Sequence, residues 1–169
     1  MNIVALFLAE FDREVKRSRR TLEAVPERKS GWKPHEKSME FGYLAYLVAS
    51  IPTWLTKIIQ DDELDVAPKD VARRDPPHFN TSAEYVAELE KAAADVRAAF
   101  QGTTEEHLQT PWKLLAAGQV VIESPRHEMI RETINHWAHH RGQLTVYLRL
   151  LGAKVPALYG PSADDKNFA

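Results

Sequence analysis

Residues 126–151 read RHEMIRETINHWAHHRGQLTVYLRLL, and this segment decides the fold. When the residues are placed about 100° apart on a helical wheel, the large apolar side chains share one arc: Ile130, Ile134, Trp137, Leu144, Leu148 and Leu151. The polar arc holds Glu128, Glu132, Asn135 and His139. Ser124 and Pro125 predict the N-cap and first residue, and Gly152 predicts the end. The segment therefore predicts an amphipathic helix over 125–151.

Three further helices are predicted upstream, near residues 3–24, 38–60 and 81–101, because apolar residues recur there at helical spacing. Ser38 is the predicted N-cap of the second of these helices. Pro52 lies inside it and predicts a kink, because proline lacks the N–H that the helix needs. Four helical patterns and almost no strand predict an all-α four-helix bundle.

The connections between these helices have patterns of their own. Residues 61–80 are polar and proline-containing, which predicts a long surface loop. Thr81 and Glu84 form the pattern of a capping box at the start of the third helix. Residues 112–122 contain two short apolar runs around Ala117-Gly118, which predicts a small β-hairpin before the last helix. Two such short strands must pack on the bundle to be stable.

Composition limits the classes of function. The 169 residues predict a single domain over 1–169. There is no cysteine, which excludes disulfides, thiolate metal sites and cysteine nucleophiles. The net charge is −2, and the one basic run, Lys16–Arg20, is interpreted as a solvated helix face, so we expect no nucleic-acid partner. The apolar start at residues 1–8 is too short to span a membrane, so we expect a soluble, uncleaved, cytoplasmic protein.

His136 and His140 are the candidate metal ligands. Imidazoles at i and i+4 lie one helical turn apart, so both can reach one ion such as zinc or nickel. The alternative is a pair of partly buried histidines that bind only their protein neighbours. Trp137 occupies the position where a zincin motif carries its glutamate base, so a zincin is excluded. His139 is expected to point away from the pair. The remaining histidines are not expected to be ligands, with a loop histidine that folds over the site as the alternative: His35, His78, His107 and His127.

Several motifs resemble the DinB/YfiT-like superfamily. The run from His136 to Arg149, followed by Gly152 and by YGPS at 159–162, is similar to its C-terminal signature. Residues 32–38 (WKPHEKS) and 42–52 (GYLAYLVASIP) are similar to its entry into the second helix. The resemblance covers nearly the whole chain. It implies a bundle whose helices run up, down, down and up, and a homodimer.

The resemblance also implies a divalent metal ion held by three histidines. Two of them correspond to His136 and His140 on the last helix. The third belongs to the second helix, where the family pattern Leu-Ala-x-His-Val-Ala reads LAYLVA at residues 44–49. Leu47 stands at the histidine position, and a leucine cannot bind a metal. We therefore expect zinc or nickel to bind weakly or not at all.

Two functions remain open. The resemblance implies a metal-dependent hydrolase or small-thiol transferase, here with a degenerate metal site. The alternative is a non-catalytic, dimeric bundle without metal, associated with stress or binding a small molecule. Substrate and catalytic residues are not predicted by the sequence.

Overall fold

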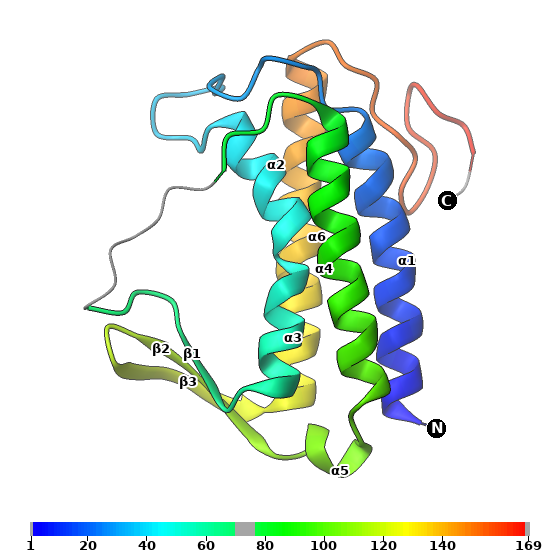
Figure 1. Ribbon diagram of the computed structural model, residues 1–169. Coiled ribbons are helices and arrows are strands. Elements are labelled where there is room, and N and C mark those ends of the chain that lie inside the picture. Colours follow the sequence, from blue (N-terminus) through cyan, green and yellow to red (C-terminus); the bar gives the residue numbers. More distant parts are fainter. Residues whose placement is uncertain (1, 70–76, 168–169) are drawn as a thin grey trace.

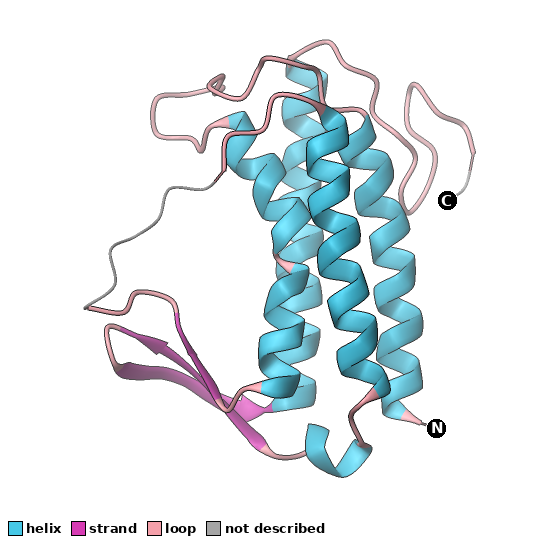
Figure 2. Ribbon diagram, in the orientation of Figure 1, coloured by secondary structure: helices cyan, strands magenta, loops and turns pink. Residues whose placement is uncertain are grey.

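The computed structural model describes residues 2–69 and 77–167 and is mostly helical (Figure 1, Figure 2). The helices are α1 (Ile3–Glu23), α2 (Phe41–Ser50), α3 (Pro52–Gln60), α4 (Ser82–Gln101), α5 (Glu105–Leu108) and α6 (Arg126–Leu150). The strands are β1 (Glu63–Asp65), β2 (Pro111–Ala116) and β3 (Gln119–Pro125). The predicted predominance of helix is confirmed. None of the helices in these two ranges is both long and apolar enough to cross a membrane.

The long helices lie side by side, and α2 leads directly into α3 (Figure 1). In Figure 1, α1 and α6 ascend, whereas α2, α3 and α4 descend. Their apolar faces meet in one core, which includes Phe11, Leu44, Leu89 and Trp137. The three strands lie outside the helices, beside the lower ends of α3 and α6 (Figure 2).

The predicted second helix, 38–60, is two helices that meet at Pro52. The kink or local break expected at Pro52 is confirmed as a break, because Pro52 is the first residue of a separate helix, α3. The predicted cap at Ser38 is wrong, since α2 begins at Phe41. The N–H groups of Phe41 and Gly42 donate instead to the carbonyls of Trp32 (2.7 Å) and Ser30 (2.8 Å). A Cβ at Gly42 would lie 2.6 Å from Cβ of Ser30, so only glycine permits this approach.

The hairpin predicted at 112–122 is confirmed as β2 and β3, but the sheet has a third strand. β1 pairs with β2 in parallel, with Glu63 opposite Lys113, so part of the predicted loop 61–80 is wrong. The rest of that prediction falls partly on residues 70–76, which lie outside the described residues. The carboxylate of Asp65 accepts hydrogen bonds from the N–H groups of Ala67 (2.9 Å), Ala117 (3.1 Å) and Gly118 (2.7 Å). The bond from Ala67 contributes most to lowering the pKa of Asp65. The bonds from Ala117 and Gly118 hold the hairpin turn against β1.

The last helix begins one residue later than predicted. β3 continues through Ser124 and Pro125, so the predicted N-cap at Ser124 is wrong. The reason is Arg126, whose backbone N–H donates to the carbonyl of Thr110 at 3.0 Å. Its buried guanidinium donates to the carbonyls of Ile58 and Asp61 at the end of α3. Arg126 therefore ties the start of α6 to the end of α3.

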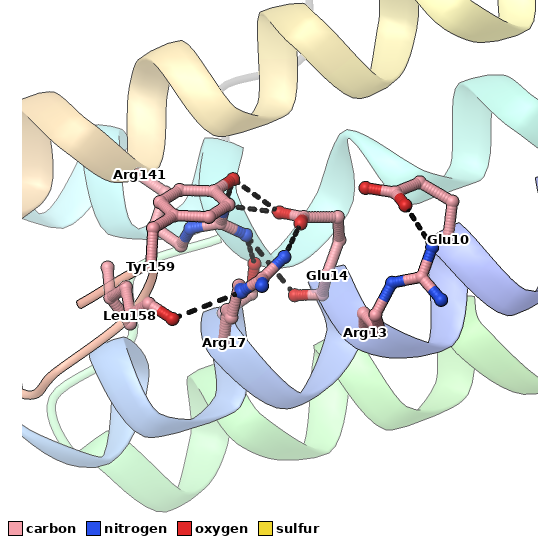
Figure 3. Close-up of polar contacts among 8 residues, drawn as sticks. Glu10, Arg13, Glu14, Arg17, Arg141, Leu158 and Tyr159 are labelled. Carbon is pink, nitrogen blue, oxygen red and sulfur yellow. Dashed lines mark hydrogen bonds and ion pairs between the residues drawn. The ribbon is translucent and has the colours of Figure 1, made fainter. Parts of the chain in front are cut away.

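A buried ion pair joins α1 to α6 (Figure 3). Glu14 and Arg141 are each no more than 1% exposed, and Arg141 Nη2 donates to Glu14 Oε2. Arg141 Nη1 donates to the hydroxyl of Ser18 at 3.0 Å. The hydroxyl of Tyr159 donates to Glu14 at 2.9 Å, and Arg17 pairs with the other carboxylate oxygen. Both buried charges are therefore compensated by hydrogen bonds.

The surroundings of Glu14 predict how this pair affects stability. Burial raises the pKa of Glu14, but Arg141, Tyr159 and Arg17 together lower it below its ordinary 4.5. Because the unfolded chain takes up the proton first, the stabilisation is complete above about pH 4.5 and is lost as pH falls through the lower folded pKa. Glu14→Gln should flatten the dependence of the free energy of unfolding on pH in this range, as urea denaturation would measure.

Arg141→Met should be more damaging than Glu14→Gln near pH 7. It leaves Glu14 charged and without its main partner in the core, so we expect a loss of about 3–5 kcal/mol. The control is Glu10→Gln, one turn earlier on α1, where Glu10 pairs with Arg13 at the surface (Figure 3). That change should stay within about 0.5 kcal/mol. Equal losses for Glu10→Gln and Arg141→Met would contradict the assignment.

Candidate functional site

The two candidate histidines lie together on α6. Nε2 of His136 and Nε2 of His140 are 3.2 Å apart, and the two rings are nearly perpendicular. Because the residues are one turn apart, the helix backbone alone brings the rings into contact. His140 is buried and His136 is exposed. The pair therefore lies at the boundary between the core and the surface.

Gln143 fixes the orientation of His140. Its amide oxygen lies 2.9 Å from Nδ1 of His140 and accepts the hydrogen bond of that N–H. The other ring nitrogen, Nε2, then carries a lone pair directed at His136. This arrangement is typical of a histidine that accepts a hydrogen bond or binds a metal through Nε2.

The pKa values of His136 and His140 are both lowered, which favours the neutral form of each imidazole. Burial contributes most to lowering the pKa of His136, and the neighbouring His140 and His139 lower it further. Burial likewise lowers the pKa of His140, whereas the bond to Gln143 acts in the opposite direction. A neutral imidazole can accept a proton or a metal ion, so the pair is available for either chemistry near neutral pH.

A cleft of about 410 Å³ opens beside His136, between α3, α6 and the inner face of the sheet. The ring of Trp54 on α3 stacks on His136, with 6.0 Å between centroids and 15° between planes. The apolar wall consists of Trp54, Ile58, Trp112, Leu114, Ile122 and Met129, and the polar side of Glu132, Thr133, Asn135, His136 and His139. Apolar walls with a few polar groups are typical of small-molecule sites.

Three other histidines, His139, His107 and His127, differ in their contacts. His139 lines the cleft, and its ring centroid is 5.3 Å from that of His140, so the prediction that it points away from the pair is wrong. His107 Nε2 bonds to the carbonyl of Ile59 at 2.7 Å, and His127 Nδ1 to that of Leu108 at 3.0 Å. These two side chains therefore each link α5 or α6 to a neighbouring backbone segment.

His35 and His78 are exposed and lie in connections between helices. His35 Nδ1 accepts a hydrogen bond from the backbone N–H of Lys37 at 3.1 Å, which is a local turn contact. The structure therefore brings His136, His139 and His140 together and keeps the other four histidines elsewhere.

The histidine pair fits a metal ion only in part. Two nitrogens bound to one tetrahedral zinc ion at 2.0–2.1 Å lie about 3.3 Å apart, close to the 3.2 Å observed. Leu47 is half-buried on α2, and the adjacent Val48 accepts a hydrogen bond from Trp137 Nε1 at 2.6 Å. Within residues 2–69 and 77–167, no group of three His, Cys, Asp or Glu side chains could hold a metal ion. These residues therefore do not supply the three-histidine set.

Comparison with known proteins identifies the family to which the chain is similar. The family model described as the DinB family matches residues 2–167. The uncharacterized protein YrdA of Bacillus subtilis (strain 168) is 33% identical over 87 residues, which are 50% of this chain and 49% of YrdA. The chain thus matches about half the length of this curated relative.

Two solved structures have a similar fold. One is the DinB-like protein YjoA of Bacillus subtilis, with a TM-score of 0.67 and 16% identity, covering 88% of this chain and 94% of YjoA. The other is a DinB-like protein of Bacillus cereus ATCC 10987, with a TM-score of 0.70 and 21% identity, covering 90% and 95% of the two chains. At these identities the comparison supports the fold alone.

The pKa shifts of the histidine pair predict a titration pattern. Both rings should take up their protons below the ordinary pKa of 6.5. Gln143→Leu should lower the pKa of His140 further, because the bond to Gln143 is what raises it. His139→Gln should raise the pKa of both rings, since His139 lowers both. Long-range ¹H–¹⁵N NMR titration measures each ring separately.

The same shifts have a consequence for stability. Because the unfolded chain protonates first, the contribution of the histidine pair to stability is complete above about pH 6.5 and is lost as pH falls through the two lower folded pKa values.

In the NMR titration, an unchanged pKa of His140 in Gln143→Leu would contradict the assigned role of Gln143.

Proposed function

The chain belongs to the DinB family, and from that premise we propose that it is a small-molecule-binding protein whose site is the cleft beside His136. The observation that supports the proposal is the cleft itself, whose apolar wall consists of two tryptophans, three aliphatic side chains and one methionine. A volume of about 410 Å³ is within the range of ligand pockets. In this proposal the neutral imidazoles orient the ligand by hydrogen bonding, and no metal is required.

We further propose that this site lies in a four-helix bundle of the up-down-down-up kind, in which α2 and α3 form one interrupted helix. The observed directions of the long helices support this topology (Figure 1). The homodimer implied by the family resemblance belongs to the same proposal. The association with stress remains an expectation from that resemblance.

Naphthalene tests the proposed site, because it is flat, apolar and small enough for the cleft. We expect saturable shifts of the Met129 methyl signal in ¹³C NMR. Trp54→Ala should weaken binding about tenfold, which corresponds to about 1.4 kcal/mol, because it removes one aromatic wall. Trp32→Ala is the matched control, since Trp32 is equally half-buried but packs on Tyr147 outside the cleft. The absence of saturable shifts at Met129 would reject the site.

The second candidate is the metal-dependent hydrolase or small-thiol transferase that the family resemblance implies. It is favoured by the 3.2 Å separation of the two Nε2 atoms, which suits a shared ion. A metal ion with open positions supplies a Lewis acid that activates water or a thiol. With two protein nitrogens, most of the coordination shell would be left to water. We therefore expect weak, sub-stoichiometric binding of zinc or nickel in the wild type.

Leu47→His tests whether this is a family metal site that lacks one ligand. The third imidazole should complete the set, so zinc should raise the melting temperature of the variant much more than that of the wild type. Leu47→Gln is the matched control, because it is polar and of similar size but offers no imidazole. Adding His140→Gln to Leu47→His should abolish the gain. Tight, stoichiometric metal in the wild type, or no added response in Leu47→His, would refute the interpretation.

A further inference from the structure

The outward face of α6 is apolar near its C-terminal end. Val146 and Leu150 lie one helical turn apart there and are 57% and 58% exposed. Within residues 2–69 and 77–167, no other large aliphatic side chain is as exposed as these two. The opposite face of the helix is buried in the core through Leu144 and Leu148. A helix that carries apolar side chains on both faces is usually covered on both.

Gly142 lies on the same outward face, one turn before Val146. Glycine is a poor residue for the interior of a helix, because its backbone loses the most freedom on folding. A Cβ at Gly142 would have no atom of another described segment within 4 Å, and the φ angle of Gly142 is not positive. Packing within the described chain therefore does not explain this glycine, whereas close approach of a second helix does.

The order of residues along this face fits a second copy of α6 that runs in the opposite direction. If the two copies cross at Gly142, Val146 of one copy lies opposite His139 of the other, because these residues are four and three positions from the crossing. Glu128, exposed near the start of α6, likewise comes close to Lys154, exposed just beyond its end. Opposite charges thereby meet, whereas a parallel pair would place Glu128 against Glu128. The contact is self-complementary, as a two-fold axis requires.

The same arrangement covers one side of the cleft. Asn135 and His139 line the cleft and are exposed. With the crossing at Gly142, Leu150 of the second copy lies beside Asn135, and Val146 of the second copy lies beside His139. We propose that a second copy of the chain packs antiparallel on α6 about Gly142 and supplies these two aliphatic side chains to the mouth of the cleft. This inference rests on the proposed function, because it names the partner that completes the same site.

A dimer of mixed isotope labelling tests the contact directly. Val146 and His139 are seven residues apart on one helix, or about 10 Å along its axis, which is too far for a nuclear Overhauser effect. In an equal mixture of ¹³C-labelled and unlabelled chains, we expect an isotope-filtered effect between the Val146 methyl protons and the His139 ring protons. Its absence in the wild-type protein would overturn the inference.

Val146→Lys tests the interface by mutation. It places a charge where the second copy packs, so the dissociation constant of the dimer should rise about a hundredfold in sedimentation equilibrium. Val121→Lys is the matched control, because Val121 is also a valine, is 55% exposed and lies on β3 rather than α6. The control should dissociate as the wild type does. A monomeric wild type, or equal effects of the two substitutions, would overturn the inference.

Gly142→Ala should have opposite effects on the single chain and on the dimer. In the Val146→Lys background, the added methyl group should raise the melting temperature by about 2–4 °C, because alanine favours the helix. In the wild-type background it should weaken the dimer about tenfold, because the methyl group holds the two helices apart. A Gly142→Ala dimer as tight as the wild type would overturn the inference.

Naphthalene separates this inference from the proposed function. Because the second copy covers part of the cleft, Val146→Lys should bind naphthalene about tenfold more weakly than Val121→Lys, as the shifts of Met129 measure. Equal affinities would overturn the inference and leave the proposed binding site intact. If the contact between Val146 and His139 is observed but naphthalene binds to none of the proteins, the proposed binding site is wrong and the contact between the two copies stands.

Discussion

Glu14 and Arg141 lie where neither charge reaches water, and their ion pair joins the first long helix to the last. Removing two charges from water is costly, so the pair persists only because Ser18, Tyr159 and Arg17 supply the remaining hydrogen bonds. Ser18 and Arg17 lie on α1, and Tyr159 lies in the segment after α6. The pair thereby fixes how α6 is rotated against α1. That rotation also decides which face of α6, with His136, lines the cleft.

The helices could be predicted from sequence because each has a repeating apolar pattern. The prediction failed where a contact distant in the chain replaced a local signal. Ser38 has the chemistry of a cap, but the backbone of Ser30 and Trp32 occupies the start of α2. β1 has three residues, too few for a strand pattern, and exists because β2 offers it an edge. The wheel gave no reason to bury Arg141, since its partner is 127 residues away.

The site shows the same division between local and distant information. The contact between His136 and His140 follows from a spacing of one helical turn, and sequence alone predicts it. The cleft does not, because Trp54, Trp112 and Met129 come from three different elements. No spacing in the sequence relates these three residues. Trp112 in the predicted hairpin was the one available signal, because a marginal hairpin must pack a large side chain against the bundle.

The connectivity of the ion pair constrains how the protein folds during synthesis. Glu14 leaves the ribosome before its partners, since Arg141 follows 127 residues later and Tyr159 follows 145 residues later. Until then, α1 carries a carboxylate on its inner face that no other segment neutralises. Burying that face of α1 before α6 is made would leave Glu14 with only Arg17 of its own helix as a charged partner. Contacts of such long range also slow folding, because a large loop must close before they form. Completion of this buried network therefore requires both α6 and the segment that contains Tyr159.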